Sequence, residues 1–187
     1  MIEELSDLST DMDLYKKFLL GNNEAFNHLI VKYRKMITDF IMYYVKEVEV
    51  AEDIAQDSFL YMIINKKEYD FKYSFKTYLY TIARSRTFNY LKKGKKEISV
   101  EDINLNGLEA TINIEDEVLN NYNRERIESA IAGLKREYQV IIVLYYFQNF
   151  KYKEISEILN ISMSKTKMMI NRAKKKIKKL LMEEDMI

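Results

Sequence analysis

Apolar residues recur every three or four positions along most of this 187-residue chain, and this spacing is typical of amphipathic helices. The first long stripe follows Asn23, a residue type that can cap a helix, and it comprises Phe26, Leu29, Ile30, Tyr33, Ile37, Phe40, Ile41 and Tyr44. A second helix is predicted over about 50–65, with Ile54, Phe59, Met62 and Ile63 on its apolar face. Because no segment of useful length alternates as a strand does, the sequence predicts an all-α fold.

A third helix is predicted after an aromatic loop, KEYDFKYS, at residues 67–74. Ser74 can cap this helix and Gly94 can end it, with Phe75, Tyr78, Leu79, Ile82 and Ala83 facing inward. Over residues 96–117 the helical stripe fails and the chain is rich in Asn, Glu and Asp without proline, which is typical of a flexible linker. The sequence therefore predicts two small helical domains, 1–95 and 118–187, joined by a flexible acidic linker at 96–117.

The C-terminal part carries the pattern of a helix-turn-helix within YKEISEILNISMSKTKMMI. Ser156 is small where two helices approach, Asn160 tolerates the left-handed conformation that ends a helix, and Ser162 can cap the next one. The predicted buried contacts of this motif are Ile155, Leu159, Ile161, Thr166 and Ile170. A helix of this kind fits the major groove of DNA.

A net charge of +1 conceals strong segregation of charge along the chain. Residues 84–96 and 165–179 contain cations but no acid, whereas residues 97–128 are strongly acidic. Because electrostatic fields act locally in salt solution, these blocks predict two basic surfaces separated by an acidic connector, and DNA is the partner expected for the second, which follows the helix-turn-helix. The alternative for the second block is a helical hairpin with a solvated lysine face, and its last cations also complement a helix dipole.

The composition excludes several kinds of chemistry. The chain has no cysteine and one histidine, His28, which we expect to be a structural residue with satisfied hydrogen bonds rather than a ligand. No spaced carboxylate pair, glycine-rich loop or metal set supports an enzyme, so no cofactor or metal is expected. Residues 1–13 carry acids and no base, unlike a signal peptide, and the longest apolar run, at 140–147, is too short to span a bilayer. We expect a cytoplasmic protein without direct membrane insertion.

Motifs in both halves of the chain together resemble one family. The N-terminal half contains EAFNHLIVKYRKMITDFIMYYV, AEDIAQDSFL and SFKTYLYTIARS, and the C-terminal half contains YQVIIVLYYFQNFKYKEISEILNISMSKTKMMINRAKKKI. In this order they resemble regions 2 and 4 of a bacterial RNA polymerase sigma factor of the extracytoplasmic-function (ECF) group, over roughly residues 13–181. The resemblance implies a non-enzymatic factor that binds the polymerase core and directs initiation at specific promoters.

The resemblance also implies partners and a role for individual residues. Region 2 would dock on the beta-prime clamp helices of the polymerase through Glu52, Asp53, Gln56 and Asp57, and region 4 would meet the beta flap. The opened minus 10 strand would be held by Phe71, Tyr73, Lys76, Arg84, Ser85, Arg86 and Asn89. The minus 35 duplex would be read by Ser164, Lys165, Lys167, Met168, Asn171, Arg172 and Lys175. Such factors are commonly inhibited by an anti-sigma factor, and we expect one here.

Some features depart from the family pattern, and other functions stay open. Tyr78 stands where the family usually has Trp, and Ser85 where it often has Asn. In region 4, Lys165 replaces a frequent Thr, and Met168 stands where polar residues are common.

A free-standing helix-turn-helix regulator would explain the C-terminal half alone, and a protein-interaction module would show DNA binding with little salt dependence.

Overall fold

The computed structural model describes residues 10–93 and 124–184. All regular structure in these ranges is helical, which confirms the predicted fold class. The chain forms two compact units, Met1–Glu97 and Ile98–Ile187. The predicted linker at 96–117, the stop at Gly94 and the resumed helical pattern at 118–122 lie outside the described residues.

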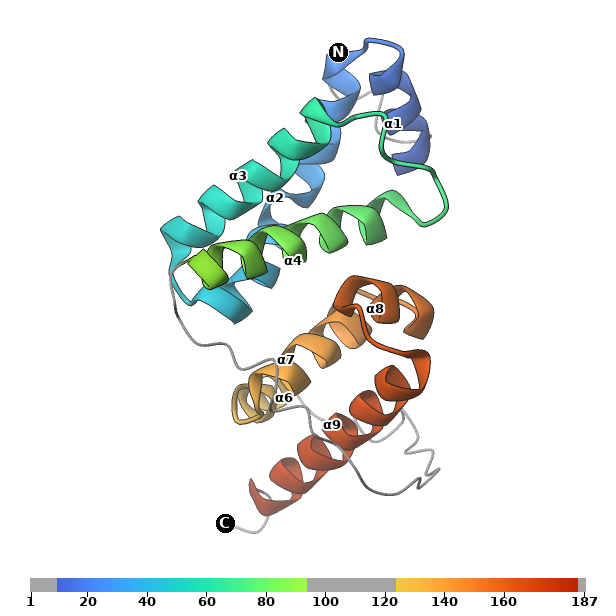
Figure 1. Ribbon diagram of the computed structural model, residues 1–187. Helices are drawn as coiled ribbons and strands as arrows, with labels where there is room; N and C mark the ends of the chain where they lie inside the picture. The colour runs from blue at the N-terminus through green and yellow to red at the C-terminus, as the bar shows by residue number, and fades with distance from the viewer. Residues whose placement is uncertain (1–9, 94–123, 185–187) are drawn as a thin grey trace. The chain divides into compact units, whose positions relative to one another are not determined.

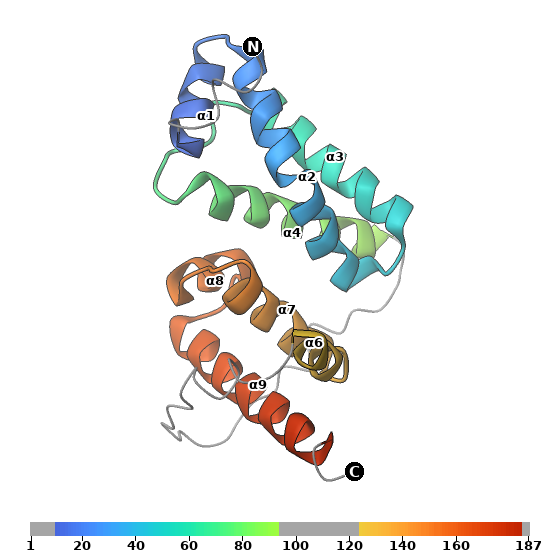
Figure 2. The same ribbon diagram turned by 180° about the vertical axis from the view of Figure 1, so that it is seen from behind.

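The first unit consists of four helices: α1 (Asp11–Leu19), α2 (Asn23–Val45), α3 (Val48–Ile64) and α4 (Phe75–Lys93). Helix α2 packs against α1 and α3, and α4 packs across α2 and α3 (Figures 1 and 2). The apolar stripes predicted for these helices meet in one core, whose fully buried members include Phe26, Leu29, Ile37, Ile41, Met62, Phe75 and Leu79. Burial of these stripes is the main stabilising term of the unit.

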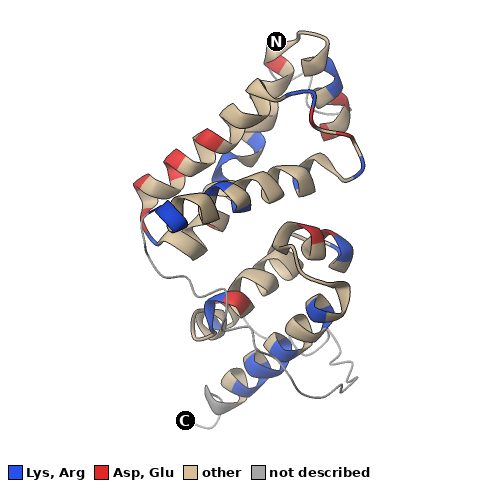
Figure 3. Cartoon of the chain, viewed as in Figure 1, with Lys and Arg blue, Asp and Glu red and all other residues tan. Residues whose placement is uncertain are grey.

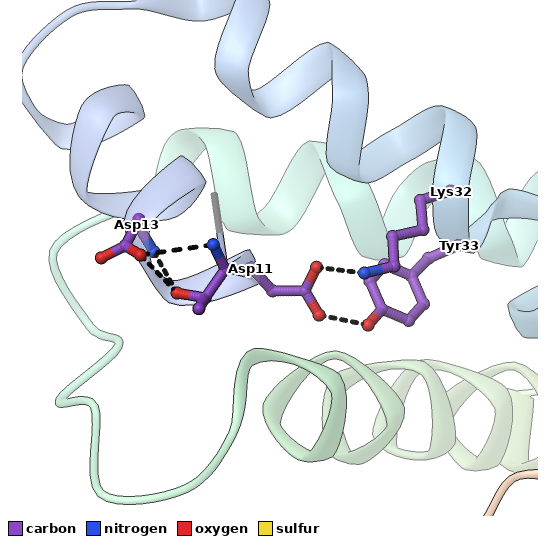
Figure 4. Close-up of polar contacts among 5 residues, drawn as sticks. Asp11, Asp13, Lys32 and Tyr33 are labelled. Carbon is purple, nitrogen blue, oxygen red and sulfur yellow. Dashed lines mark hydrogen bonds and ion pairs between the residues drawn. The ribbon is translucent and has the colours of Figure 1, made fainter. Parts of the chain in front are cut away.

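Helix α1 was not predicted from the sequence. Thr10 accepts a hydrogen bond at Oγ1 from the Asp13 amide (3.2 Å), and Asp13 Oδ2 accepts one from the Thr10 amide (3.3 Å), which together form a capping box. The Thr10 hydroxyl donates to the same carboxylate and lowers the pKa of Asp13. Asp11 then fastens α1 to α2, because its carboxylate accepts hydrogen bonds from Lys32 Nζ (2.6 Å) and from the Tyr33 hydroxyl (Figure 4).

Three local predictions in this unit need correction. The cap of α2 is Asn22, whose side chain accepts a hydrogen bond from the Ala25 amide (3.1 Å), because the chain turns at Gly21 (φ 100°) and the helix starts at Asn23 itself. Ile63 was predicted to face inward but is 41% exposed. His28 Nε2 is buried and has no hydrogen-bond partner among the described residues, so the expectation that the hydrogen bonds of this histidine are satisfied is not met at this nitrogen. The predicted cap of α4 is confirmed, since Ser74 Oγ accepts from the Thr77 amide (3.1 Å).

The second unit packs its shorter helices on one long one. The elements are α6 (Arg124–Ala132), α7 (Arg136–Ile142), the π-helical turn η2 (Val143–Phe147), α8 (Tyr152–Leu159) and α9 (Met163–Glu184), and α6, α7 and α8 all pack against α9. The core is lined by Ile141, Leu144, Ile155, Ile170, Ala173, Ile177 and Leu181. The sequence predicted an uninterrupted helical pattern over 138–147, whereas the hydrogen-bond register widens after Ile142 into the π turn.

Candidate nucleic-acid and protein interfaces

The turn between α8 and α9 has the geometry that the sequence predicts for a helix-turn-helix. Asn160 ends α8 in the left-handed conformation (φ 50°, ψ 50°). Ser156 Oγ donates to the Ile161 carbonyl (2.6 Å), and the Ile161 amide donates to the Ser156 carbonyl (3.1 Å), so one serine ties both ends of the turn. Ser162 caps α9 by accepting a hydrogen bond from the Lys165 amide (3.2 Å). These contacts fix the angle at which α9 leaves the turn.

The seven minus 35 candidates lie on one side of α9. Ser164, Met168, Asn171 and Lys175 follow an i, i+4, i+7, i+11 spacing, so they form a single stripe. The side chains around this stripe are exposed or half-buried, and the opposite side of α9 is buried through Thr166, Ile170, Ala173, Ile177 and Leu181. In Figure 3 the Lys and Arg positions, coloured blue, recur along the ribbon of α9. The helix therefore combines a packed face with a cationic face, as insertion into a DNA groove requires.

Some cations of the basic block at residues 165–179 do not lie on the exposed cationic face of α9. Lys174 is 5% exposed, and its Nζ lies 4.7 Å from the ring centre of Tyr145 and 5.3 Å from that of Tyr146. Lys176 Nζ lies 4.6 Å from the ring centre of Tyr138. These ammonium groups sit on aromatic rings of α7 and η2, where they stabilise packing within the unit.

The four polymerase-docking candidates lie along α3, whose acids are visible in Figure 3. Asp53 and Gln56 are exposed. Glu52 approaches Arg34 of α2 at 4.0 Å, and Asp57 pairs with Arg86 of α4 at 3.1 Å. Asp53 and Asp57 are one turn apart and share a face, so the structure presents an acidic stripe there with two of its four members joined to neighbouring helices.

The same side of α3 continues into exposed apolar side chains that sequence reasoning missed. Leu60 is 52% exposed and Ile64 is 70% exposed, and they follow Asp53 and Asp57 at i+7 spacing. The signal that reveals them is a helical wheel of residues 48–64: too many apolar residues are present for one face to bury. An exposed helix face of acids followed by large apolar residues is suited to a protein partner.

The aromatic loop at 67–74 brings together the first group of minus 10 candidates. Phe71 and Tyr73 are half-buried, and Lys72 Nζ lies 5.3 Å from the ring centre of Tyr73. Lys76 is half-buried in the first turn of α4. Partly exposed rings beside cations are suited to stacking on unpaired bases.

The remaining minus 10 candidates do not share one face of α4. Ser85 and Asn89 are exposed and one turn apart. The Arg84 guanidinium instead packs on the Phe88 ring (4.5 Å), and burial lowers the pKa of Arg84. Arg86 covers the Tyr61 ring (4.4 Å) while it pairs with Asp57. The structure thus brings Ser85 and Asn89 together, directs Arg86 toward α3 and packs Arg84 on Phe88.

The described residues do not support a metal site or a membrane-spanning helix. No group of three or more His, Asp or Glu side chains within residues 10–93 and 124–184 is arranged to hold a metal ion. Within the same ranges, none of the helices has both the length and the apolarity that crossing a bilayer needs.

Both halves of the chain match established family models. Residues 29–97 match Sigma-70 region 2, and residues 124–177 match Sigma-70, region 4. The ECF RNA polymerase sigma factor SigW of Bacillus subtilis is 30% identical over 175 residues, which cover 89% of this chain and 94% of that protein. The ECF RNA polymerase sigma-E factor of Escherichia coli K12 is 26% identical over 182 residues, covering 92% and 95%.

Solved structures support the same fold. The structure of CnrH in complex with the cytosolic domain of CnrY aligns with a TM-score of 0.63 at 18% identity, covering 92% of this chain and 97% of that one. The sigma factor RpoE of Bartonella quintana, crystallised with the anti-sigma factor NepR, aligns with a TM-score of 0.59 at 17% identity, covering 83% and 96%. Similarity to SigW over 89% of this chain, with regions 2 and 4 matched in order, settles the family: the chain belongs to the ECF RNA polymerase sigma factors.

Proposed function

We propose that this protein binds the RNA polymerase core and directs transcription initiation at a specific set of promoters. The proposal rests on one observation: each unit has an exposed helix face whose charge and polarity complement one of the two partners, the polymerase core or DNA. The acidic and apolar face of α3 suits a basic helical partner, and the cationic face of α9 suits a DNA duplex.

Docking on the polymerase uses α3. We assign Asp53, Gln56 and Asp57 to polar contacts with the beta-prime clamp helices, and Glu52 to the edge of the same surface. Leu60 and Ile64, which are exposed in the free chain, supply apolar area that loses water on docking. A polar stripe that fixes register, next to apolar side chains that add affinity, is the usual division of labour in an interface. Region 4 meets the beta flap.

Promoter recognition is divided between the two units. The α9 face reads the minus 35 element as duplex, with Lys167 and Arg172 directed to phosphates or base edges. The aromatic loop and α4 hold the opened minus 10 strand, where unpaired bases stack on rings and cations attract the backbone. This function locates the protein with the polymerase and the chromosome in the cytoplasm.

Inhibition by an anti-sigma factor completes the proposal. Two neighbours of the same fold, CnrH and RpoE, were solved with CnrY and with the anti-sigma factor NepR, respectively. The exposed apolar side chains of α3 are the kind of surface that such a partner would cover. Affinity capture of the tagged protein from its native cells should return a second protein besides polymerase, and capture of polymerase alone would contradict this part of the proposal.

The docking assignment is tested by the affinity for core polymerase. Asp53→Ala should weaken binding by about tenfold, the effect of losing one desolvated charge contact of about 1.4 kcal/mol. Asp39→Ala is the matched control, because Asp39 is an exposed acid that lies on α2 rather than on α3. Its ion pair is with Lys35, one turn earlier in the same helix (2.6 Å). Equal affinities of the two variants, measured by fluorescence anisotropy, would contradict docking through α3.

A further inference from the structure

One tyrosine lies beneath the aromatic loop and closes it from the inside. Tyr69 is 3% exposed, and its hydroxyl donates a 2.6 Å hydrogen bond to the backbone carbonyl of Tyr73. This bond spans four residues and joins the two ends of the segment that contains Phe71. Asp70 adds a second tie, since its Oδ1 accepts a hydrogen bond from the Lys72 amide (3.0 Å).

The ring of Tyr69 also joins the loop to the helices on either side. It stacks on Tyr78 of α4 with a centroid distance of 4.7 Å and an interplanar angle of 16°. It meets the Tyr15 ring of α1 edge to face with a centroid distance of 5.1 Å, and it contacts the Phe71 ring at 4.5 Å with a tilt of 38°. Tyr15 in turn donates from its hydroxyl to the Lys66 carbonyl (3.0 Å). The start, middle and end of the loop are therefore held by one buried aromatic cluster.

This support maintains a backbone conformation that is costly by itself. Phe71 has φ 60°, in the left-handed region that residues with a side chain seldom adopt. Such a residue is energetically unfavourable and persists only where the surrounding contacts hold it in place. The hydrogen bond and the ring contacts of Tyr69 hold the Phe71 backbone in this conformation. As a result the partly exposed Phe71 and Tyr73 are presented in one arrangement before any ligand arrives.

The stacked pair lies in line with the exposed residues of α4. Tyr78 and Ser85 are seven residues apart, and Asn89 follows four residues later, so the three lie on one side of the helix. The partly exposed edge of the tyrosine stack therefore connects the loop with the Ser85 and Asn89 side chains. A single strand that crosses the loop can continue along this side of α4.

We propose that Tyr69 is the positioning residue of the promoter-strand site: its hydroxyl fixes the Tyr73 carbonyl and so sets the Phe71 and Tyr73 rings for stacking on unpaired bases. This inference rests on the proposed function in promoter opening. Tyr69 itself is too buried to touch DNA and acts through the loop. A preformed loop binds a flexible strand more tightly because the ordering of its own backbone is already complete.

The test removes only the hydroxyl. Holoenzyme is reconstituted from core polymerase and wild-type protein, Tyr69→Phe or Tyr80→Phe. The probe is a fluorescein-labelled single strand covering the non-template minus 10 region of a promoter that the wild-type holoenzyme transcribes. Tyr80→Phe is the matched control, because Tyr80 is a fully buried tyrosine of α4 whose hydroxyl approaches the Met36 carbonyl at 3.5 Å, outside the loop.

Tyr69→Phe should weaken strand binding about three- to tenfold, the range that one hydrogen bond contributes, and leave the affinity for core polymerase unchanged. Tyr80→Phe should bind the strand as the wild type does. Strand affinities within twofold for all three proteins would overturn the role of Tyr69, as would equal losses in both variants. If the wild-type holoenzyme itself fails to bind the strand better than a random one of equal length, the part of the proposed function that assigns minus 10 strand binding to the loop and α4 fails instead.

Discussion

Neighbouring lysines of α9 have opposite environments. Lys174 is buried on the rings of Tyr145 and Tyr146, whereas Lys175 is exposed in the stripe with Ser164 and Asn171. The basic block as a whole predicted a DNA surface, but only the cations on one side of the helix are available to DNA. At the scale of residues, exposure and local partners therefore decide the role of a charge that composition cannot assign.

The α9 assignment predicts the effect of Lys167→Ala on promoter binding. The free energy of binding to the promoter duplex should weaken by about 1–3 kcal/mol if Lys167 contacts a base. If Lys167 contacts a phosphate, the slope of log K against log salt concentration should decrease in magnitude by about 1. Lys135→Ala is the control, because Lys135 is exposed at the cap of α7, away from the stripe. The measurement is duplex binding at several salt concentrations. No change in either quantity for Lys167→Ala would mean that another face of the unit binds DNA.

At the scale of elements, stripes and caps were the predictable part of the fold. The helices α2, α3 and α4 and the helix-turn-helix follow from apolar spacing, and Ser74, Asn160 and Ser162 act as predicted. Helix α1 was not predicted because it is short, although the capping box formed by Thr10 and Asp13 is a sequence signal for its start. The π turn could not be predicted, because the apolar spacing of residues 138–147 does not distinguish a π register from an α register.

Candidate residues were predictable as a set but not in their arrangement. The seven residues of the α9 face share one side because helical spacing alone determines this. The pairing of Asp57 with Arg86, by contrast, joins residues of two different helices, and no sequence spacing encodes it. The same holds for Tyr69, whose importance appears only when α1, the loop and α4 are seen together.

The contact between η2 and α9 predicts a difference in stability between two adjacent substitutions. Lys174→Ala should lower the free energy of unfolding by about 1–3 kcal/mol, because it removes a buried side-chain stem and two cation–π contacts. Lys175→Ala should change it by less than about 0.5 kcal/mol, since the side chain is exposed. Denaturant unfolding followed by circular dichroism measures both. Equal effects would contradict the assignment of Lys174 to the packing of the unit.

At the scale of the whole molecule, buried tyrosines make the first unit sensitive to alkali. Burial raises the pKa of Tyr69 and Tyr78 to about 12 and also raises those of Tyr15, Tyr33 and Tyr80. Unfolded tyrosines lose their protons near pH 10, so above that pH the unfolded state binds fewer protons than the folded one. The stabilising contribution is therefore complete below pH 10 and is lost as the pH rises toward 12.

The melting temperature of the full chain should accordingly fall between pH 9 and pH 11 by more than it changes between pH 7 and pH 9. Tyr80→Phe removes one of the responsible groups and should reduce that fall. Thermal unfolding with tyrosinate absorbance as a second signal provides the measurement. Identical alkaline profiles for wild type and Tyr80→Phe would show that other groups govern the loss.

The central claim, that one chain uses α3 to bind polymerase and α9 to select promoters, is tested most directly by run-off transcription. Core polymerase is incubated with fragments of the native genome, with and without the protein. We predict discrete transcripts that require the protein, that fall by up to about tenfold with Asp53→Ala when the protein is limiting, and that persist with Asp39→Ala. Promoter binding that is independent of core polymerase and yields no transcript would contradict the claim and identify a free-standing regulator instead.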